Sequence, residues 1–126
     1  MDSKLLNKLL KPLEPTYVPI NSTPKPVGPN QVSIVRIRND HWVTLIPALG
    51  AAATDKKLII DSELFQRNAT CGLFSIVAVL AFKVGGSKYV NELFHRQFST
   101  NQSQLIENEL VCLNLIKQWI RRLLYF

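Results

Sequence analysis

The hydrophobic pattern changes along the chain, and the change predicts strands first and helices afterwards. Residues 31–38, 42–46 and 57–61 are short runs rich in Val, Ile and Leu, separated by turn-forming residues at 39–40 and 50–54. Runs of this length with short connections predict three strands of an antiparallel sheet. From Cys71 onward apolar residues recur at helical spacing. The expected fold class is α+β, a small antiparallel sheet packed by helices.

The helical half contains signals that divide it into three helices. Gly85-Gly86 is a C-cap signal that ends the first helix, and Ser87 can cap a second that runs to about Phe98. Thr100 or Ser103 can open a third, which continues to near the C-terminus. The apolar residues of the third helix predict one broad buried face, made of Leu105, Ile106, Leu110, Cys112, Leu113, Ile116, Ile120 and Leu123.

The N-terminal segment predicts a helix followed by an extended arm. Residues 2–11 have leucines on one face and lysines around the other, so this helix could dock on its own domain, on a partner or on a membrane surface. Residues 12–30 hold six of the seven prolines, which favours an extended tether. We therefore expect an N-terminal helix and Pro-rich arm over 1–30 and a folded domain over 31–126.

Composition narrows the classes of protein that fit. The chain has 126 residues, 47% hydrophobic, with a formal net charge of +6, which is typical of one globular domain. We expect no membrane-spanning segment and no secretory signal, and hence an intracellular protein. Two cysteines and two histidines make a disulfide framework or a zinc site improbable, and no cofactor is expected. The scattered basic residues fit a solvated surface at least as well as a site for nucleic acid, anionic membrane or acidic protein.

Cys71 lies where a polar loop meets the apolar run of the first helix. The N-terminus of a helix carries unpaired N–H groups and partial positive charge, which favour a thiolate over a thiol. Gly72 leaves room for a substrate to approach. The alternative is that Cys71 is a buried cysteine that acts only as a small hydrophobe.

Three other residues stand at places that suit cysteine catalysis. His41 begins one strand, Asp61 ends the next, and Gln66 precedes Cys71 by five positions. His41 would take the thiol proton and later protonate the leaving amine, while Asp61 would fix the imidazole tautomer. The Gln66 amide and the Cys71 backbone N–H would hold the oxyanion. Each also has a structural alternative: a histidine at a strand start, a strand-ending turn and a surface glutamine.

The remaining candidates are expected to be structural. Cys112 lies among apolar residues and is expected in the core, and His95 is expected on a polar helix surface. Two further carboxylates compete with Asp61. Asp40 adjoins His41, but consecutive strand residues point to opposite faces. Asp55 lies in the second turn, at the far end of the expected sheet.

The order of these motifs resembles a known superfamily. His-Trp at 41–42, Asp-Ser at 61–62, Gln66 and Cys-Gly at 71–72 are similar to the adenovirus endopeptidase and SUMO-protease superfamily of cysteine peptidases, most closely over residues 68–74. The resemblance covers about residues 37–83. It implies catalytic His41, Asp61 and Cys71, with Gln66 in the oxyanion hole. Trp42, beside the histidine, is expected to contact substrate.

The resemblance also implies an activity and a setting. It implies a thiol endopeptidase that cuts after small residues, often glycine pairs, in a viral precursor or a ubiquitin-like tail. Only Ser62 to Phe65 separate Asp61 from Gln66, where the family has a long insert, so the chain would be a shortened viral-type member of the host cytoplasm or nucleus, or of the virion. The alternatives are a protease-like binding module without turnover and a basic nucleic-acid-binding accessory protein.

Overall fold

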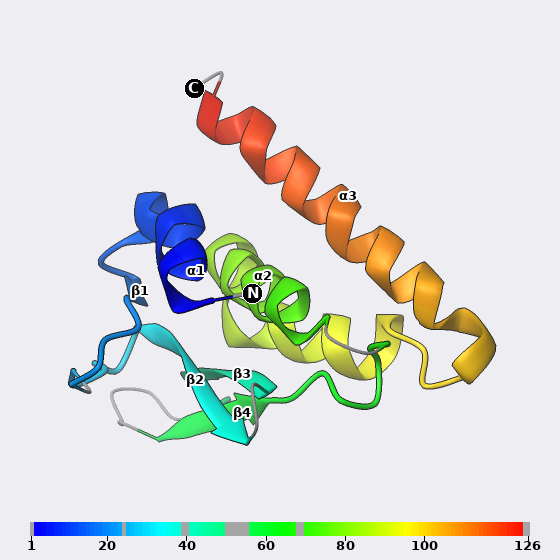
Figure 1. Ribbon diagram of the computed structural model, residues 1–126, viewed down its shortest axis with the longest axis horizontal. Helices are drawn as coiled ribbons and strands as arrows, with labels where there is room; N and C mark the ends of the chain where they lie inside the picture. The colour runs from blue at the N-terminus through cyan, green and yellow to red at the C-terminus, as the bar shows by residue number, and fades with distance from the viewer. Residues whose placement is uncertain (1, 24, 39–40, 50–55, 68–69, 125–126) are drawn as a thin grey trace.

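The computed structural model describes residues 2–23, 25–38, 41–49, 56–67 and 70–124, with side chains of the last helix to Arg122. In chain order its elements are α1 (Ser3–Leu10), the 3-10 turn η1 (Lys11–Leu13), β1 (Tyr17–Val18), β2 (Val32–Arg38), β3 (His41–Pro47), β4 (Lys57–Ile60), α2 (Cys71–Glu92), the π-helical η2 (Leu93–Gln97), the 3-10 turn η3 (Gln102–Gln104) and α3 (Leu105–Leu124). Figure 1 shows the sheet on one side of α2 and α3 on another.

The strands form one sheet in the order β1-β2-β3-β4. β2, β3 and β4 pair antiparallel, as the sequence predicts, and the α+β class is confirmed. The sheet is nevertheless mixed, because β1 pairs parallel to β2. β1 comes from the Pro-rich segment, and parallel neighbours need a long connection, which residues 19–31 provide. The turns predicted at 39–40 and 50–54 lie outside the described residues.

Helix α2 packs along β3 and runs in the same direction. The Thr44 hydroxyl donates to the Ser75 carbonyl (3.4 Å), and the Ser87 hydroxyl donates to the Pro47 carbonyl. These two contacts join the middle of β3 to the first part of α2, and the end of β3 to the part of α2 that follows Gly86. The first residues of β3 and of α2 therefore lie at the same end of the sheet–helix layer.

Gly86 divides α2 as the sequence predicts. Its φ of 71° and ψ of −169° are not helical, and only glycine adopts such a conformation readily. The helix changes direction there and continues through Tyr89 into η2. The break therefore separates the segment that carries Cys71 from the segment that leads to α3.

The N-terminal segment belongs to the same core as the sheet and α2. Leu6, Leu10 and Tyr17 are at most 1% exposed and join the central apolar cluster. The side chain of Asn7 accepts from the Tyr17 hydroxyl (2.7 Å) and exchanges two hydrogen bonds with the backbone of Ile20. The sequence allows the N-terminal helix to dock on its own domain, on a partner or on a membrane, and in the structure it docks on its own chain. The core thus extends into residues 1–30, which the sequence pattern assigns to an arm.

Helix α3 does not have the single broad apolar face that its sequence predicts. Leu105 and Cys112 are buried, and Trp119 packs against the core. Other members of the predicted face, Leu110 and Leu113, are 54% and 53% exposed. The apolar residues thus form two stripes, of which one packs on α2.

The continuous helical stretch Cys71–Gln97 is long and apolar enough to cross a membrane by length and composition alone. Half of its most apolar window is buried inside the protein, and a buried core helix meets the same two criteria.

Candidate active site

His41 and Asp61 are in direct contact, as the strand order predicts. His41 Nε2 lies 2.7 Å from Asp61 Oδ1. Thr44 pairs with Ile60 across β3 and β4. Continuing that register by one residue places Asp61 beside Val43, and alternation puts His41 on the same side of the sheet. Short antiparallel pairing thus suffices to bring the two side chains together.

Two neighbours orient the Asp61 carboxylate. Its Oδ1 also accepts from the backbone N–H of Glu63 (3.0 Å), and its Oδ2 lies 4.0 Å from the Arg38 guanidinium, which bonds Glu63 Oε2 at 2.8 Å. Arg38 and Glu63 are not among the site residues that the sequence predicts. Their signal is local: Asp61 and Glu63 are two apart, the spacing of an Asx turn, and Arg38 ends the strand beside the one that His41 begins.

The ring nitrogen that Asp61 occupies determines what His41 can do. When Nε2 donates its proton to a carboxylate, the neutral imidazole has an unprotonated Nδ1, which is an acceptor. His41 is therefore held in a tautomer that can accept a proton from a thiol. Its side chain is 14% exposed and that of Asp61 is 33% exposed, so the imidazole is largely shielded from water while the carboxylate remains partly accessible.

Cys71 is the first residue of α2, as predicted, and is 7% exposed. Thr44 follows His41 by three residues, and its partner Ser75 follows Cys71 by four. The cysteine and the histidine therefore share one end of the sheet–helix layer. Helix α2 covers the face of β3 on which Thr44 lies, whereas His41 lies on the opposite face. A contact between the thiol and the imidazole therefore has to form around the end of the strand.

Trp42 is not placed to contact a substrate. It is 4% exposed and belongs to the core cluster, and the Arg36 guanidinium lies 4.7 Å from its ring centroid. The physical reason is strand alternation, which turns Trp42 to the opposite face from His41. The expected substrate-binding role is therefore replaced by a structural one.

Gln66 is held by Ser62, which is not among the site residues that the sequence predicts. The Ser62 hydroxyl donates to Gln66 Oε1, and Ser62 is 3% exposed. This bond fixes the amide oxygen and leaves the amide NH₂ to face elsewhere. Gln66 can therefore donate to an oxyanion, which is the role that the sequence predicts for it.

Helix α3 anchors the loop that joins β4 to α2. Buried Asn108 donates to the carbonyls of Phe65 (2.9 Å) and Ser99 (2.7 Å). Glu109 makes a two-point contact with the Arg67 guanidinium at 2.6–3.1 Å, which raises the pKa of that guanidinium above its usual value. In the sequence, Asn108 is a polar residue within an apolar stripe, and that position is the one sign that it is buried and hydrogen-bonded.

Cys112 and His95 occupy the places predicted for them. Cys112 is completely buried, and desolvation, followed by the charge of Glu109, raises the pKa of its thiol to about 12. His95 is exposed. Asp40 and Asp55, the competing carboxylates, lie outside the described residues. Among the residues that the structure describes, no three His, Cys, Asp or Glu side chains form a potential metal site.

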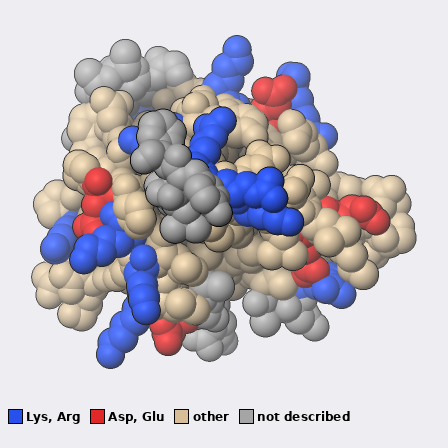
Figure 2. Space-filling view, turned by 90° about the horizontal axis from the view of Figure 1, so that it is seen from above, with Lys and Arg blue, Asp and Glu red and all other residues tan. Residues whose placement is uncertain are grey.

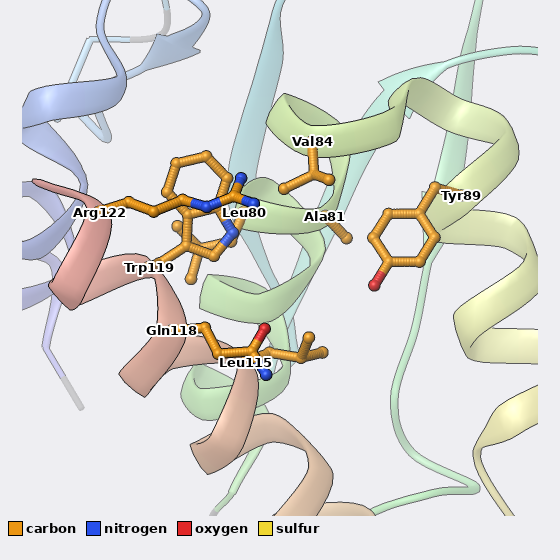
Figure 3. Close-up of a pocket in the computed structure, with 8 residues that line it drawn as sticks. All are labelled: Leu80, Ala81, Val84, Tyr89, Leu115, Gln118, Trp119 and Arg122. Carbon is orange, nitrogen blue, oxygen red and sulfur yellow. The ribbon is translucent and has the colours of Figure 1, made fainter. Parts of the chain in front are cut away.

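One partly enclosed hollow has a lining that includes neither His41 nor Asp61. It is a space of about 70 Å³ between α2 and α3 (Figure 3), lined on the α3 side by Leu115, Trp119 and Arg122. Arg122 lies 5.9 Å from the Trp119 ring. Tyr89, from the segment after the Gly86 break, closes another side (Figure 3). Its lining combines apolar side chains with Tyr89, Gln118 and Arg122 and contains no cysteine, histidine or carboxylate, so we assign it to imperfect packing between two helices.

No family model, curated protein or solved structure matches the chain.

Proposed function

We propose that the protein is a cysteine endopeptidase in which Cys71 is the nucleophile, His41 the general base and acid, and Asp61 the residue that orients His41. The observation that carries the proposal is the 2.7 Å contact between His41 Nε2 and Asp61 Oδ1. It lies at the end of the sheet where the helix headed by Cys71 also begins. A cysteine, a histidine and an orienting carboxylate are the groups that acyl transfer to a thiol requires.

Each group has a defined step in this mechanism. His41 Nδ1 accepts the Cys71 proton, and the thiolate attacks the scissile carbonyl carbon. The oxyanion accepts hydrogen bonds from the Cys71 backbone N–H and the Gln66 amide. His41 returns the proton to the leaving amine, and water then hydrolyses the thioester with His41 as base.

The substrate class follows from the limited room at the thiol. Cys71 is 7% exposed, and a residue without a side chain can approach such a thiol most closely. This supports the specificity implied by the resemblance to the adenovirus endopeptidase and SUMO-protease superfamily, which is cleavage after glycine. The proposed substrates are accordingly glycine-containing protein segments of a viral precursor or a ubiquitin-like modifier, in an intracellular setting.

A protease-like binding module without turnover is the second candidate. The observation that favours it is the placement of α2 on the face of β3 opposite His41. Reaction would require the thiol and the imidazole to meet around the strand end. The short connection between Asp61 and Gln66 limits how far this end of the fold can adjust.

A nucleic-acid accessory role remains compatible with either candidate. Figure 2 shows Lys and Arg at separate places on one face of the molecule, with acidic residues among them. A net charge of +6 on a dispersed pattern supports weak, salt-sensitive binding to phosphates without sequence preference.

An electrophilic probe with a glycine-glycine tail tests the proposal. We expect one covalent adduct on Cys71, identified by mass spectrometry, and its loss in Cys71→Ala and His41→Ala. Glu92→Gln, which neutralises an exposed carboxylate at the end of α2, should keep the adduct. A folded wild-type protein that the probe does not label would favour the binding module over the peptidase.

A further inference from the structure

Helix α3 carries a stripe of apolar residues that the rest of the described chain does not cover. Ile106, Leu110, Leu113 and Ile120 are 49–54% exposed, while the core-facing Cys112 is fully buried. Figure 1 shows α2 and the sheet on one side of α3 and no described element on the other side. Surface residues as large as these rarely repeat along one helix without a partner.

The stripe has the spacing of a coiled-coil seam. With Lys117 it runs 106, 110, 113, 117 and 120, so the intervals alternate between four and three residues. This is the a/d pattern of a heptad repeat, which presents a seam to a second helix. A shallow hollow of about 510 Å³ lies along it, with Leu110, Leu113 and Lys117 in its lining.

We propose that α3 of a second copy of this chain docks on the stripe in antiparallel orientation, so that the protein forms a two-fold symmetric dimer. The same stripe then serves both subunits, as a two-fold axis requires. Leu110 of one copy would lie opposite Ile120 of its partner, and Leu113 opposite Lys117.

The charges along the stripe select this orientation. Glu107 flanks one end and Arg121 flanks the other, fourteen residues or about 21 Å apart along the helix. Antiparallel docking brings Glu107 of each copy to Arg121 of the other, so two opposite-charge pairs form at the margins. The Lys117 stem can cover the facing leucine while its ammonium reaches water.

Parallel docking lacks these advantages. It would place the Lys117 side chains of the two copies against each other within the seam, where like charges repel. It would also leave Glu107 and Arg121 without opposite charges across the interface. A second copy in antiparallel orientation is therefore the occupant that this surface fits.

Sedimentation equilibrium of the full chain tests the proposal. We expect a dimer at about 50 μM, and at least a tenfold larger dissociation constant for Leu110→Glu and for Leu113→Glu. Leu9→Glu is the matched control, because Leu9 is a 49% exposed helical leucine on α1. It should leave the dimer unchanged. Far-ultraviolet circular dichroism and the unfolding midpoint should be unchanged in all three variants, because each position is exposed.

A mixing experiment tests the orientation. Glu107→Arg alone and Arg121→Glu alone should each weaken self-association, and an equimolar mixture of the two variants should restore it as a heterodimer. This follows only if residue 107 of one copy meets residue 121 of the other. Self-association without restoration in the mixture would overturn the antiparallel arrangement.

Two results would overturn the dimer itself. One is a monomer at every concentration to about 100 μM. The other is wild-type binding to vesicles containing anionic lipid that is lost in Leu110→Glu while the protein in solution stays monomeric, which would assign the stripe to a membrane surface. Neither experiment depends on peptidase activity, so the dimer and the peptidase can fail separately.

Discussion

The start of α2 and the middle of α3 each bury a cysteine, in different surroundings. Cys71 is the first residue of its helix, at the end of the sheet where His41 and Asp61 form a polar pair. Cys112 lies inside a helix and is completely buried, and its thiol has a pKa raised to about 12. Burial alone therefore does not separate the two thiols, because both are buried. Position on the helix and the nearby base separate them.

The comparison also shows why an apolar environment suppresses cysteine chemistry. The thiolate is the nucleophile, and removing it from water disfavours the charge. A helix N-terminus offsets part of that cost, whereas the middle of a helix has no free N–H groups to offer. The same residue type thus has a proposed catalytic role in one helix and a packing role in the other.

Substituting each cysteine in turn has the largest expected effect. Cys71→Ala should abolish cleavage of a glycine-glycine peptide and change the free energy of unfolding by less than about 1 kcal/mol. Cys112→Ser should retain cleavage and lose about 1–3 kcal/mol of stability, because it places a hydroxyl in a buried apolar site. Peptide cleavage and urea unfolding, measured on both variants, check the pair.

Two results would contradict this assignment of the cysteines. If Cys71→Ala keeps full cleavage, or if Cys112→Ser alone abolishes it in a folded protein, the assignment of the two cysteines is inverted. Cys112→Ala serves as the control for loss of the sulfur alone, since it introduces no polar group.

Amidating the carboxylate beside His41 should have the next largest effect. Asp61→Asn keeps the shape of the side chain but favours the wrong imidazole tautomer, so cleavage should fall by a factor on the order of 10²–10⁴. Glu92→Gln is the matched control, because it neutralises an exposed carboxylate at the end of α2. A normal rate in Asp61→Asn would indicate a cysteine–histidine pair that works without this orienting group.

The contact between His41 and Asp61 and the break at Gly86 are predicted features that the structure shows, and both depend on local rules. Adjacent antiparallel strands with short connections bring His41 to Asp61 regardless of the rest of the fold. The break at Gly86 follows from one residue's backbone freedom. The first depends on the pairing of two consecutive strands, and the second on a single residue.

The features that sequence did not predict depend on tertiary packing. The two-residue β1 is too short for a periodic signal, and its paired residues in β2 lie fifteen positions further along the chain. Asn108 satisfies backbone groups of two distant loops, at Phe65 and Ser99. The burial of Trp42 depends on which face of the sheet packs on the core, and its position beside His41 does not reveal that. Hydrophobic periodicity also cannot tell whether one broad apolar face meets one neighbour or two.

The core that buries Cys112 also includes α1, and a pair of leucines can show this. Leu6→Ala should lose about 2–4 kcal/mol of unfolding free energy, because Leu6 is fully buried in that core. Leu5→Ala, at a residue 43% exposed, should change it by less than about 0.5 kcal/mol. Urea unfolding measures both. Equal losses, or none, would show that α1 is the separable arm that its sequence predicts.

The smallest expected effect, and the most direct measure of the difference between the thiols, is their rate of alkylation. In the folded protein at pH 7.5, iodoacetamide should label Cys71 at least about tenfold faster than Cys112, because only a thiolate reacts and Cys112 is buried with a raised pKa. In urea the two rates should converge.

Because folding raises the pKa of Cys112 from 9.0 to about 12, the stability that depends on its neutral thiol is complete below pH 9 and is lost as the pH rises toward 12. The wild type should therefore lose more unfolding free energy between pH 8 and 10.5 than Cys112→Ala does. Equal labelling of both cysteines in the folded protein, or identical pH dependence of the two proteins, would remove the distinction on which the assignment of Cys71 depends.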